Sequence, residues 1–411
     1  MSHRVVVTGM AGISPLGCDW PTVLAKLKSY HNAVQIMPGW EQLDGLNSLL
    51  ACPAAPFKLG ERFTRRATRS MSRNSLMACC ATQRALEDAG LIDCDWIHEG
   101  GMGIAYGSCA GDPHSLMEIA ALGVEKTTRK LNATTYVRFM AHTCAVNIGV
   151  FFSITGRVIT TTSACTSGSQ AIGYAYETIK NGYQRAMIAG GAEECSVANT
   201  AIFDTLFATS TQFNDKPQLT PRPFDAQRDG LVLGEGACTL ILESLDSALE
   251  RDAPIYAEVV GFSTNSDGKH ITTPDSLKMA EVMTEALRDA NLKPEDIGYI
   301  NAHGTATLSG DRAESLATAT VFGDKTPVST LKSYMGHTLG ACGALEAWMS
   351  IEMMREGWFA PTINLTEPDP NCAALDYIMG EGRNISCEAV MSNNFAFGGI
   401  NTSLIFKRFR A

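Results

Sequence analysis

The chain lacks any run of about 18 apolar residues, the length at which a helix can cross a bilayer, so no membrane-spanning helix is expected. Its opening stretch, MSHRVVVTGMAGISP, reaches polar and turn-forming residues too early for a secretory signal peptide. We therefore expect a cytoplasmic protein that does not insert into a membrane.

Cysteine spacing typical of a disulfide framework or a zinc site is also absent, although cysteine itself is plentiful. The 13 cysteines are spread from Cys18 to Cys387, their number is odd and no CxxC pair occurs. A disulfide framework is typical of shorter secreted chains, and zinc sites need closer ligand spacing. We expect most of these cysteines to be small buried hydrophobic residues, so a reactive one has to be recognised from its context.

Acidic residues outnumber basic ones, and the formal net charge at pH 7 is −10. This balance argues against nucleic acid as the main partner. The positive residues are nevertheless clustered: five arginines stand at positions 62, 65, 66, 69 and 73, and a second basic spot lies at 129 and 130. Two interpretations stay open, a solvated helix face or a docking patch for an acidic partner.

What is present fits a folded α/β protein. The chain has 411 residues, of which 45% are hydrophobic and 18% charged, so it can bury a sizeable core. Short apolar runs at residues 4–8, 102–106 and 185–189 indicate buried strands. Residues 75–91 and 169–181 carry helical spacing. The alternation of strand and helix predicts an α/β fold with covered sheets.

Two internal echoes indicate a duplicated unit. The motif A-L-x-D-A-[GN]-L ends a predicted helix at residues 85–91 and again at 286–292, each time before a strand that opens into a Gly-rich loop. The opening strand VVVTGMAGISP is likewise echoed by AEVVGFSTNSD at residues 257–267. Because the echoes keep their order, we predict two halves, residues 1–250 and 251–411, with the join near 245–255.

Three further segments complete the organisation. The stretch SNNFAFGGINTSLIF at residues 392–406 reads as a strand, a Gly-Gly turn and another strand, which predicts a hairpin. Long insertions relative to a minimal unit lie around residues 15–70 and 110–155. Loops of that size usually carry contacts to partners or substrates.

The strongest local signal is TTSACTSGSQAIGYAYE, residues 161–177. A β-branched strand ends just before Cys165, which then stands at the turn into a helix whose first residues are small. A thiol at a helix N-terminus feels the positive end of the helix dipole, so we expect a lowered pKa for Cys165. The pattern is a nucleophile elbow with sulfur in place of oxygen.

Two other segments present histidines. NAHGTATLSGD (301–311) delivers His303 from a strand into a loop with Thr305 and Thr307, and STLKSYMGHTLGACGALE (329–346) presents Lys332 and His337. Each histidine stands beside glycine at a predicted strand end, which favours function over packing. A zinc site of both histidines with Asp311 is the alternative, but its spacing matches no common site.

Together these residues resemble a β-ketoacyl-[acyl-carrier-protein] synthase of the elongating, thiolase-fold type. The resemblance covers essentially the whole chain and rests on TTSACTSGS, NAHGTATLSGD, LKSYMGH and NNFAFGGIN in this order. It implies a thiolase fold in which duplicated α/β halves form a layered α-β-α-β-α core. Thiolases carry a second catalytic cysteine near the C-terminus, initiating and chalcone-type synthases use Cys, His and Asn, and chain-length factors lack the nucleophile. None of these patterns fits the chain.

The resemblance also implies a mechanism. Cys165 takes an acyl group from an acyl-carrier protein and condenses it with malonyl-carrier protein as CO2 leaves. The N–H groups of Cys165 and Phe397 form the oxyanion hole, and His303 and His337 hold the malonyl thioester carbonyl. The remaining roles follow the family pattern: Lys332 orients the site, paired with Glu346; Thr305 and Thr307 bind the phosphopantetheine arm; and Phe395 and Phe397 gate the acyl pocket, with Ala110 at its floor.

Partners follow from the same resemblance. Carrier proteins are acidic, and we expect docking at Arg65, Arg66, Arg69, Arg129 and Lys130. We expect a homodimer lined by residues 110–155, with a heterodimer of related subunits as the alternative, and no bound cofactor or metal. The pathway is either fatty-acid elongation or a polyketide-like pathway, because the chain also resembles, more loosely, ketosynthases of bacterial aryl-polyene biosynthesis. A non-catalytic chain-length subunit and a thiolase-like acyltransferase remain alternatives.

Overall fold

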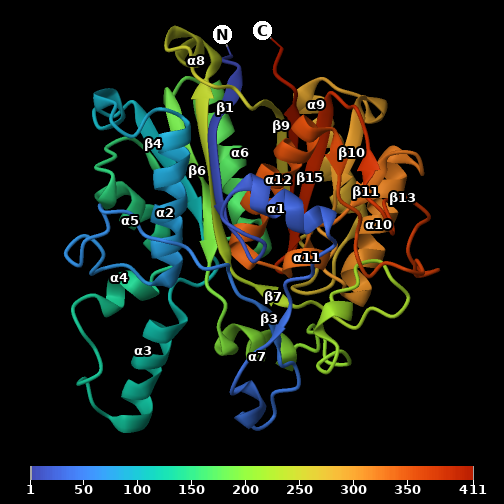
Figure 1. Cartoon of the computed structure of the whole chain (residues 1–411), viewed down its shortest axis with the longest axis horizontal. Coiled ribbons are helices and arrows are strands. Elements are labelled where there is room, and N and C mark those ends of the chain that lie inside the picture. The colour runs from blue at the N-terminus through green and yellow to red at the C-terminus, as the bar shows by residue number, and fades with distance from the viewer. Residues whose placement is uncertain (1, 411) are drawn as a thin grey trace.

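Within residues 2–410, which the computed structural model describes, eleven strands form one hydrogen-bonded sheet (Figure 1). Their order across the sheet is β13-β11-β10-β15-β16-β9-β1-β8-β6-β4-β5. The strands are β1 (Val5–Ile13), β4 (Met102–Gly107), β5 (Val158–Thr161), β6 (Ala186–Glu193), β8 (Gly236–Ser244), β9 (Ala257–Ser266), β10 (Ile297–Asn301), β11 (Pro327–Ser329), β13 (Asp376–Tyr377), β15 (Ala389–Ala396) and β16 (Ile400–Lys407). Short strands outside it are β2 (Gln35–Ile36), β3 (Leu50–Cys52), β7 (Leu233–Gly234), β12 (Trp358–Phe359) and β14 (Arg383–Asn384).

The sheet consists of two halves with the same topology. In the first half, β1 pairs antiparallel with β8 and β8 with β6, while β6, β4 and β5 run parallel. In the second half, β9, β16, β15, β10 and β11 repeat that sequence of antiparallel and parallel pairs. The halves join where β1 pairs with β9 over residues 5–7 and 257–259. The predicted duplication is therefore confirmed at the level of strand order.

Helices fill three layers around the two half-sheets. They are α1 (Trp20–Lys28), α2 (Arg73–Asp88), α3 (Pro113–Glu125), α4 (Thr135–Phe139), α5 (Thr143–Phe151), α6 (Ser167–Lys180), α7 (Val197–Thr205), α8 (Leu245–Glu250), α9 (Ser276–Ala290), α10 (Leu308–Phe322), α11 (Lys332–Met335) and α12 (Cys342–Glu356). Single 3-10 turns are η1 (Trp40–Gln42), η2 (Asp95–Ile97), η3 (Ala164–Thr166), η4 (Pro217–Leu219), η5 (Pro294–Asp296) and η6 (Leu339–Ala341).

Alternating side chains on each strand separate these layers. On β6, Met187 packs into the central core with α6 and α12, whereas Ile188 packs outward with α2 and α5. On β15, Val390 joins the central core and Met391 packs outward with α9 and α10. Figure 1 shows α6 and α12 between the two half-sheets. The molecule thus has the predicted α-β-α-β-α arrangement.

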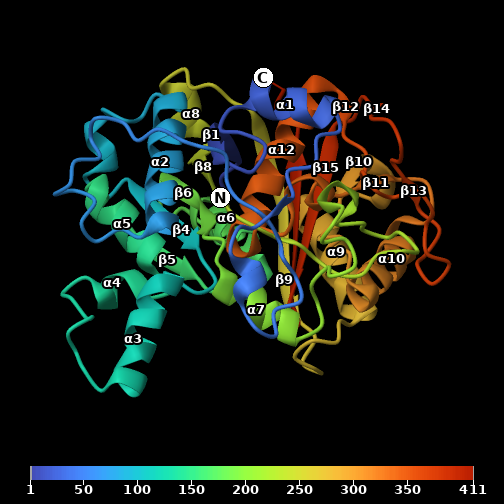
Figure 2. The same ribbon diagram turned by 60° about the horizontal axis from the view of Figure 1, so that its bottom comes forward.

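The predicted elements form with small shifts at their ends. The helix expected from residue 75 is α2, which begins at Arg73, and the hairpin of residues 392–406 is β15 and β16. Gly398 and Gly399 turn this hairpin with φ values of 91° and 72°, which side chains disfavour. The insertion at residues 110–155 folds as α3, α4 and α5, of which α3 and α4 project from the body (Figure 2). Among the described residues, no helix combines the length and the apolar character needed to cross a membrane.

Candidate active site

The candidate nucleophile lies on a strained turn between strand and helix. Strand β5 ends at Thr161, the turn η3 begins at Ala164, and α6 starts at Ser167. Ala164 has a φ of 50°, a left-handed conformation that costs free energy for a residue with a Cβ. The Ser167 hydroxyl donates to the Ala164 carbonyl at 2.7 Å and holds the turn. The side chain of Cys165 is thereby directed away from the helix axis into a pocket.

The second half of the chain repeats this elbow without a nucleophile. Leu339, with a φ of 47°, begins the turn η6 before α12, just as Ala164 begins η3 before α6. Gly340 therefore takes the place that Cys165 occupies in the first half. The two elbows face each other, because a Cβ on Gly168 would lie only 2.9 Å from the Gly340 carbonyl oxygen.

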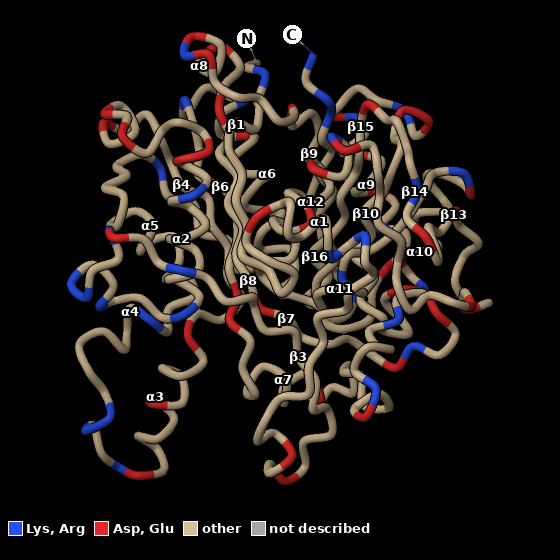
Figure 3. Tube along the Cα trace, viewed as in Figure 1, with Lys and Arg blue, Asp and Glu red and all other residues tan. Residues whose placement is uncertain are grey.

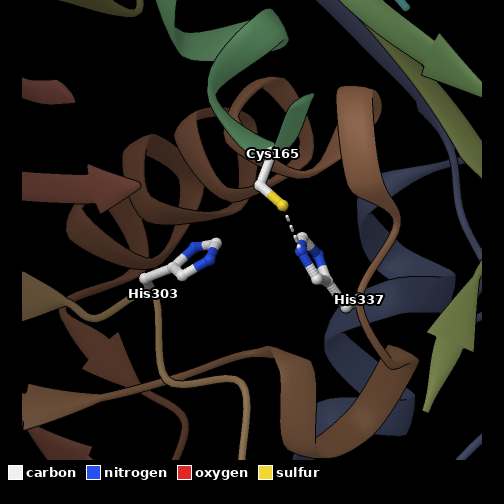
Figure 4. Close-up of side chains that lie close together, drawn as sticks. All are labelled: Cys165, His303 and His337. Atoms are coloured by element: carbon white, nitrogen blue, oxygen red, sulfur yellow. Dashed lines mark hydrogen bonds between the residues drawn. The ribbon is translucent and has the colours of Figure 1, made fainter. Parts of the chain in front are cut away.

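Two histidines from the second half converge on the thiol (Figure 4). His337 Nε2 lies 2.9 Å from Cys165 Sγ, and the rings of His303 and His337 stand edge to face with centroids 5.1 Å apart. His303 follows β10, and His337 follows α11. One side-chain atom of each residue, the sulfur or a ring nitrogen, lies within 4.8 Å of the corresponding atoms of the other two. The sequence motifs that predicted a common site are thus brought together in space.

Both imidazoles are neutral in this setting. Burial lowers the pKa of His303 and of His337 well below the usual value, and the charge of Lys332 adds to the effect. The backbone N–H of Leu339 donates to Nδ1 of His337 at 3.3 Å. A neutral imidazole has one hydrogen, so that of His337 resides on Nε2 and faces the sulfur.

The pKa of Cys165 moves against the sequence-based expectation. Burial raises the pKa of this thiol to about 12, although the charge of Lys332 and the backbone N–H groups of Phe397 and Cys165 pull it down. The prediction of a lowered pKa is therefore wrong, because desolvation of a thiolate outweighs the dipoles around it. Those same two N–H groups lie close to the sulfur, and their use as an oxyanion hole stays a prediction.

Lys332 and Glu346 form the ion pair that the family resemblance implied. The Lys332 ammonium contacts Glu346 Oε1, and both side chains are almost fully buried. Burial alone would lower the pKa of Lys332, but the Glu346 carboxylate more than compensates, and the net shift is upward. The amide of Asn394 donates to the other carboxylate oxygen at 2.7 Å. The pair is thus charged and hydrogen-bonded, as a buried pair must be to persist.

A pocket of about 660 Å³, its open mouth included, leads from the surface to the thiol. Its walls include Thr305 and Thr307, whose hydroxyls lie 3.0 Å apart, and the aromatic rings of Phe395 and Phe397. Phe397 stacks on Phe203 of α7 at 5.8 Å between centroids. Ala110 is not among the lining residues of this pocket, so its place at an acyl-pocket floor stays a prediction.

Sequence reasoning missed the carboxylates that hold the histidine loop. Glu314 on α10 accepts the backbone N–H groups of His303 and Gly304 at 2.6 and 2.7 Å. Asp311 accepts the N–H of Ala306 at 3.1 Å and lies 3.5 Å from Arg228, so it does not join the histidines as the zinc alternative required. The acidic residues are visible in the motif, but nothing in the sequence shows that α10 folds back under its own loop.

None of the predicted carrier-docking residues lines the pocket that leads to Cys165. Arg65, Arg66 and Arg69 belong to an irregular segment before α2, so the helix-face interpretation is wrong for them. Lys130 contacts Glu125, whereas Arg73 at the start of α2 pairs with Glu235 at 2.6 Å. Figure 3 shows basic segments gathered around α4. Their use as a docking surface stays a prediction.

Comparison with known proteins identifies the family. The model of the β-ketoacyl synthase N-terminal domain matches residues 2–248, and that of the C-terminal domain matches residues 256–366. The 3-oxoacyl-[acyl-carrier-protein] synthase 1 of Haemophilus influenzae is 34% identical over 411 residues, which cover 99% of both chains. The chain belongs to the β-ketoacyl synthase family.

Solved structures agree with this assignment. A β-ketoacyl synthase from Burkholderia phymatum STM815 is 54% identical and superposes with a TM-score of 0.97, over 99% of this chain and 100% of that one. The ishigamide ketosynthase/chain length factor is 29% identical with a TM-score of 0.90, over 100% of both chains. The fold is the predicted thiolase fold. The protein is a β-ketoacyl-[acyl-carrier-protein] synthase, an acyltransferase that joins acyl units by condensation.

Proposed function

We propose that Cys165 is the nucleophile that carries the acyl chain between the two steps of the reaction. The observation that carries this assignment is the 2.9 Å contact between its sulfur and His337 Nε2 at the inner end of the pocket. Sγ attacks the thioester carbon of acyl-carrier protein, the new C–S bond forms, and the phosphopantetheine thiol leaves with the proton of Cys165. The N–H groups of Cys165 and Phe397 stabilise the oxyanion of the intermediate.

In the second step His303 and His337 act as hydrogen-bond donors. The Nε2–H of His337 turns from the acylated sulfur to the thioester carbonyl of malonyl-carrier protein, together with Nε2 of His303. The bond to the carboxylate breaks, CO2 leaves, and its electron pair forms an enolate on the held carbonyl. The enolate carbon attacks the acyl-Cys165 carbonyl, which releases the thiolate and a β-ketoacyl-carrier protein. Lys332, paired with Glu346, contributes a fixed positive charge near these groups.

The pocket walls divide into a polar and an apolar part. Thr305 and Thr307 offer paired hydroxyls, which suit the amides of a phosphopantetheine arm. Phe203, Phe395 and Phe397 supply aromatic faces beside the thiol. The arm itself arrives on the acyl-carrier protein, the partner for which the Haemophilus relative is named, so no separately bound cofactor is needed.

We assign the acyl chain to a flat, unsaturated class, as in aryl-polyene or related polyketide pathways. The stacked rings of Phe203 and Phe397, at an interplanar angle of 26°, favour a planar chain over a coiled saturated one. The family resemblance puts Cys109 and Ala110, both with small side chains, near the floor of the acyl pocket, where they would make room for such a chain. Saturated fatty-acid elongation is the alternative, and the choice of acyl donors below distinguishes the two.

The protein also pairs with a second subunit in this proposal, most simply another copy of itself. Strand β5 ends the sheet, and Val158 on it and Val150 on α5 are 47% and 81% exposed. Such apolar exposure beside an open sheet edge favours a covered interface. Light scattering of the purified chain at micromolar concentration is expected to give twice the monomer mass. A monomer would favour a different subunit, as in the ketosynthase/chain length factor relative.

The intact mass of the protein after incubation with acyl-carrier proteins tests the central proposal. A single acyl adduct is expected on the wild type and none on Cys165→Ala, and Cys195→Ala is the matched control that keeps the adduct. Polyenoyl donors are expected to load at least tenfold faster than saturated donors of equal length. An adduct on Cys165→Ala would overturn the nucleophile assignment, and equal loading would favour fatty-acid elongation.

A further inference from the structure

Asn394 on β15 lies behind His303 and links it to the buried ion pair. Its Nδ2 is 2.7 Å from Glu346 Oε2 and 3.4 Å from His303 Nδ1. The three residues come from different elements, since Glu346 belongs to α12 and His303 follows β10. Asn394 is fully buried, so no solvent competes for these contacts.

The neighbours of Asn394 determine which way its amide points. Glu346 is the ion-pair partner of Lys332, and a carboxylate only accepts hydrogen bonds, so the NH2 end must face it. Among the described residues, the amide oxygen Oδ1 has no hydrogen-bond partner. The flipped amide would instead set Oδ1 against the carboxylate, which costs far more than one unpaired oxygen.

This orientation leaves one amide hydrogen for His303. The NH2 group has two hydrogens, and the first goes to Glu346 Oε2. Two acceptors are in reach of the second, His303 Nδ1 at 3.4 Å and Cys342 Sγ at 3.7 Å, and sulfur is the weaker of the two. His303 Nδ1 therefore accepts, and the single hydrogen of the neutral ring resides on Nε2, which faces the pocket.

We propose that Asn394 is a positioning residue that fixes the tautomer of His303, so that Nε2–H can donate to the malonyl thioester during decarboxylation. The inference rests on the donor role proposed above for His303. His337 has its tautomer set by a backbone N–H, whereas His303 depends on a side chain that can be replaced. Loss of Asn394 should thus impair the decarboxylation step and leave acyl transfer to Cys165 nearly intact.

The first test is the nearly isosteric substitution Asn394→Asp. It replaces the amide nitrogen Nδ2 by a carboxyl oxygen that carries at most one hydrogen. That hydrogen is donated to Glu346 in a hydrogen bond, so His303 Nδ1 then faces a hydrogen-bond acceptor. We expect CO2 release from malonyl-carrier protein to fall about a hundredfold, the effect of one lost oxyanion donor. Acylation of Cys165, followed by intact mass, should change less than threefold. A parallel loss of both steps, or decarboxylation within threefold of the wild type, would overturn the proposal.

A spectroscopic measurement decides the tautomer without reference to turnover. In protein labelled with 15N in the histidine rings, the His303 signals are assigned by their absence from His303→Gln. The wild type should show the hydrogen on Nε2, and Asn394→Asp should show it on Nδ1. An unchanged tautomer in the variant would refute the proposal that Asn394 fixes the tautomer of His303. If wild-type Cys165 took no acyl group at all, the proposed function would fail, while this measurement would still decide the role of Asn394.

Two more variants separate positioning from packing. Asn394→Ser keeps one hydroxyl hydrogen for Glu346 and none for His303, so it should show the same selective loss and serves if the Asp variant does not fold. Thr402→Val is the matched control, because the Thr402 hydroxyl donates to the Asn394 backbone carbonyl at 3.2 Å without touching the amide. It should lower the melting temperature and leave the ratio of the two rates unchanged. A selective loss of decarboxylation in Thr402→Val would count against the assignment.

Discussion

At the scale of single residues, burial controls the chemistry of this site more than the helix dipole does. The thiol of Cys165 is held protonated, with its pKa raised to about 12, and both histidines are held neutral. The resting site is therefore an uncharged thiol beside uncharged donors, next to the fixed charge of Lys332. The thiolate has to form during attack, when a bound substrate and the oxyanion hole can stabilise the displaced charge.

The neutral histidines predict how stability depends on pH. Because the folded pKa of His303 lies below that of the unfolded chain, only the unfolded state gains this proton as the pH falls below about 6.5. The free energy of unfolding should then drop by up to about 1.4 kcal/mol per pH unit for this one group. Urea unfolding of His303→Asn between pH 8 and pH 5 should give a flatter profile than the wild type. The exposed substitution His98→Asn should keep the wild-type slope, and equal slopes for all three proteins would contradict the prediction.

At the scale of elements, the sequence indicated which strand end or helix start each site residue occupies, but not which elements pack behind it. The motifs placed Cys165 before a helix and His303 after a strand, and both placements are confirmed. The burial that raises the thiol pKa could not be foreseen, because it depends on α12 packing against the first residues of α6. Asn394 stood in a recognised motif, yet its contact with His303 depends on β15 lying beside β10, a pairing that no local pattern encodes.

The close approach of α6 and α12 can be tested at Gly168. A Cβ there would lie 2.9 Å from the Gly340 carbonyl oxygen and 3.0 Å from the Ala344 nitrogen, so Gly168→Ala must push the two helices apart. We expect a loss of about 1–3 kcal/mol in stability and a fall in Cys165 acylation, since the elbow moves with α6. Gly123→Ala on α3 meets no atom within 4 Å and should not lower the melting temperature. A fully active, equally stable Gly168→Ala would refute this account of the packing.

At the scale of the whole molecule, duplication explains why the site lies between the halves. Each half builds one elbow from a strand, a turn with a positive φ at Ala164 or Leu339, and a helix. The first half supplies the thiol and the second supplies both histidines and Lys332. The sequence echoes were sufficient to predict this symmetry, because they preserve the order of helix, strand and loop. They could not predict which outer surface meets the carrier protein, since surface contacts leave no periodic pattern.

The basic segment before α2 is predicted to bind the carrier protein through its charge. An acidic carrier protein would be drawn to Arg65, Arg66 and Arg69, on a molecule whose net charge is −10. The double substitution Arg65→Glu/Arg66→Glu should raise KM for acyl-carrier protein about tenfold with little change in kcat, and should weaken the salt dependence of KM. Acyl-pantetheine, which lacks the carrier, should react with the variant as it does with the wild type. Arg288→Glu on α9, 73% exposed in its side chain, changes charge elsewhere on the surface and is the control. An equal rise in KM for this control, or for acyl-pantetheine, would contradict the proposal that these arginines act by docking the carrier protein.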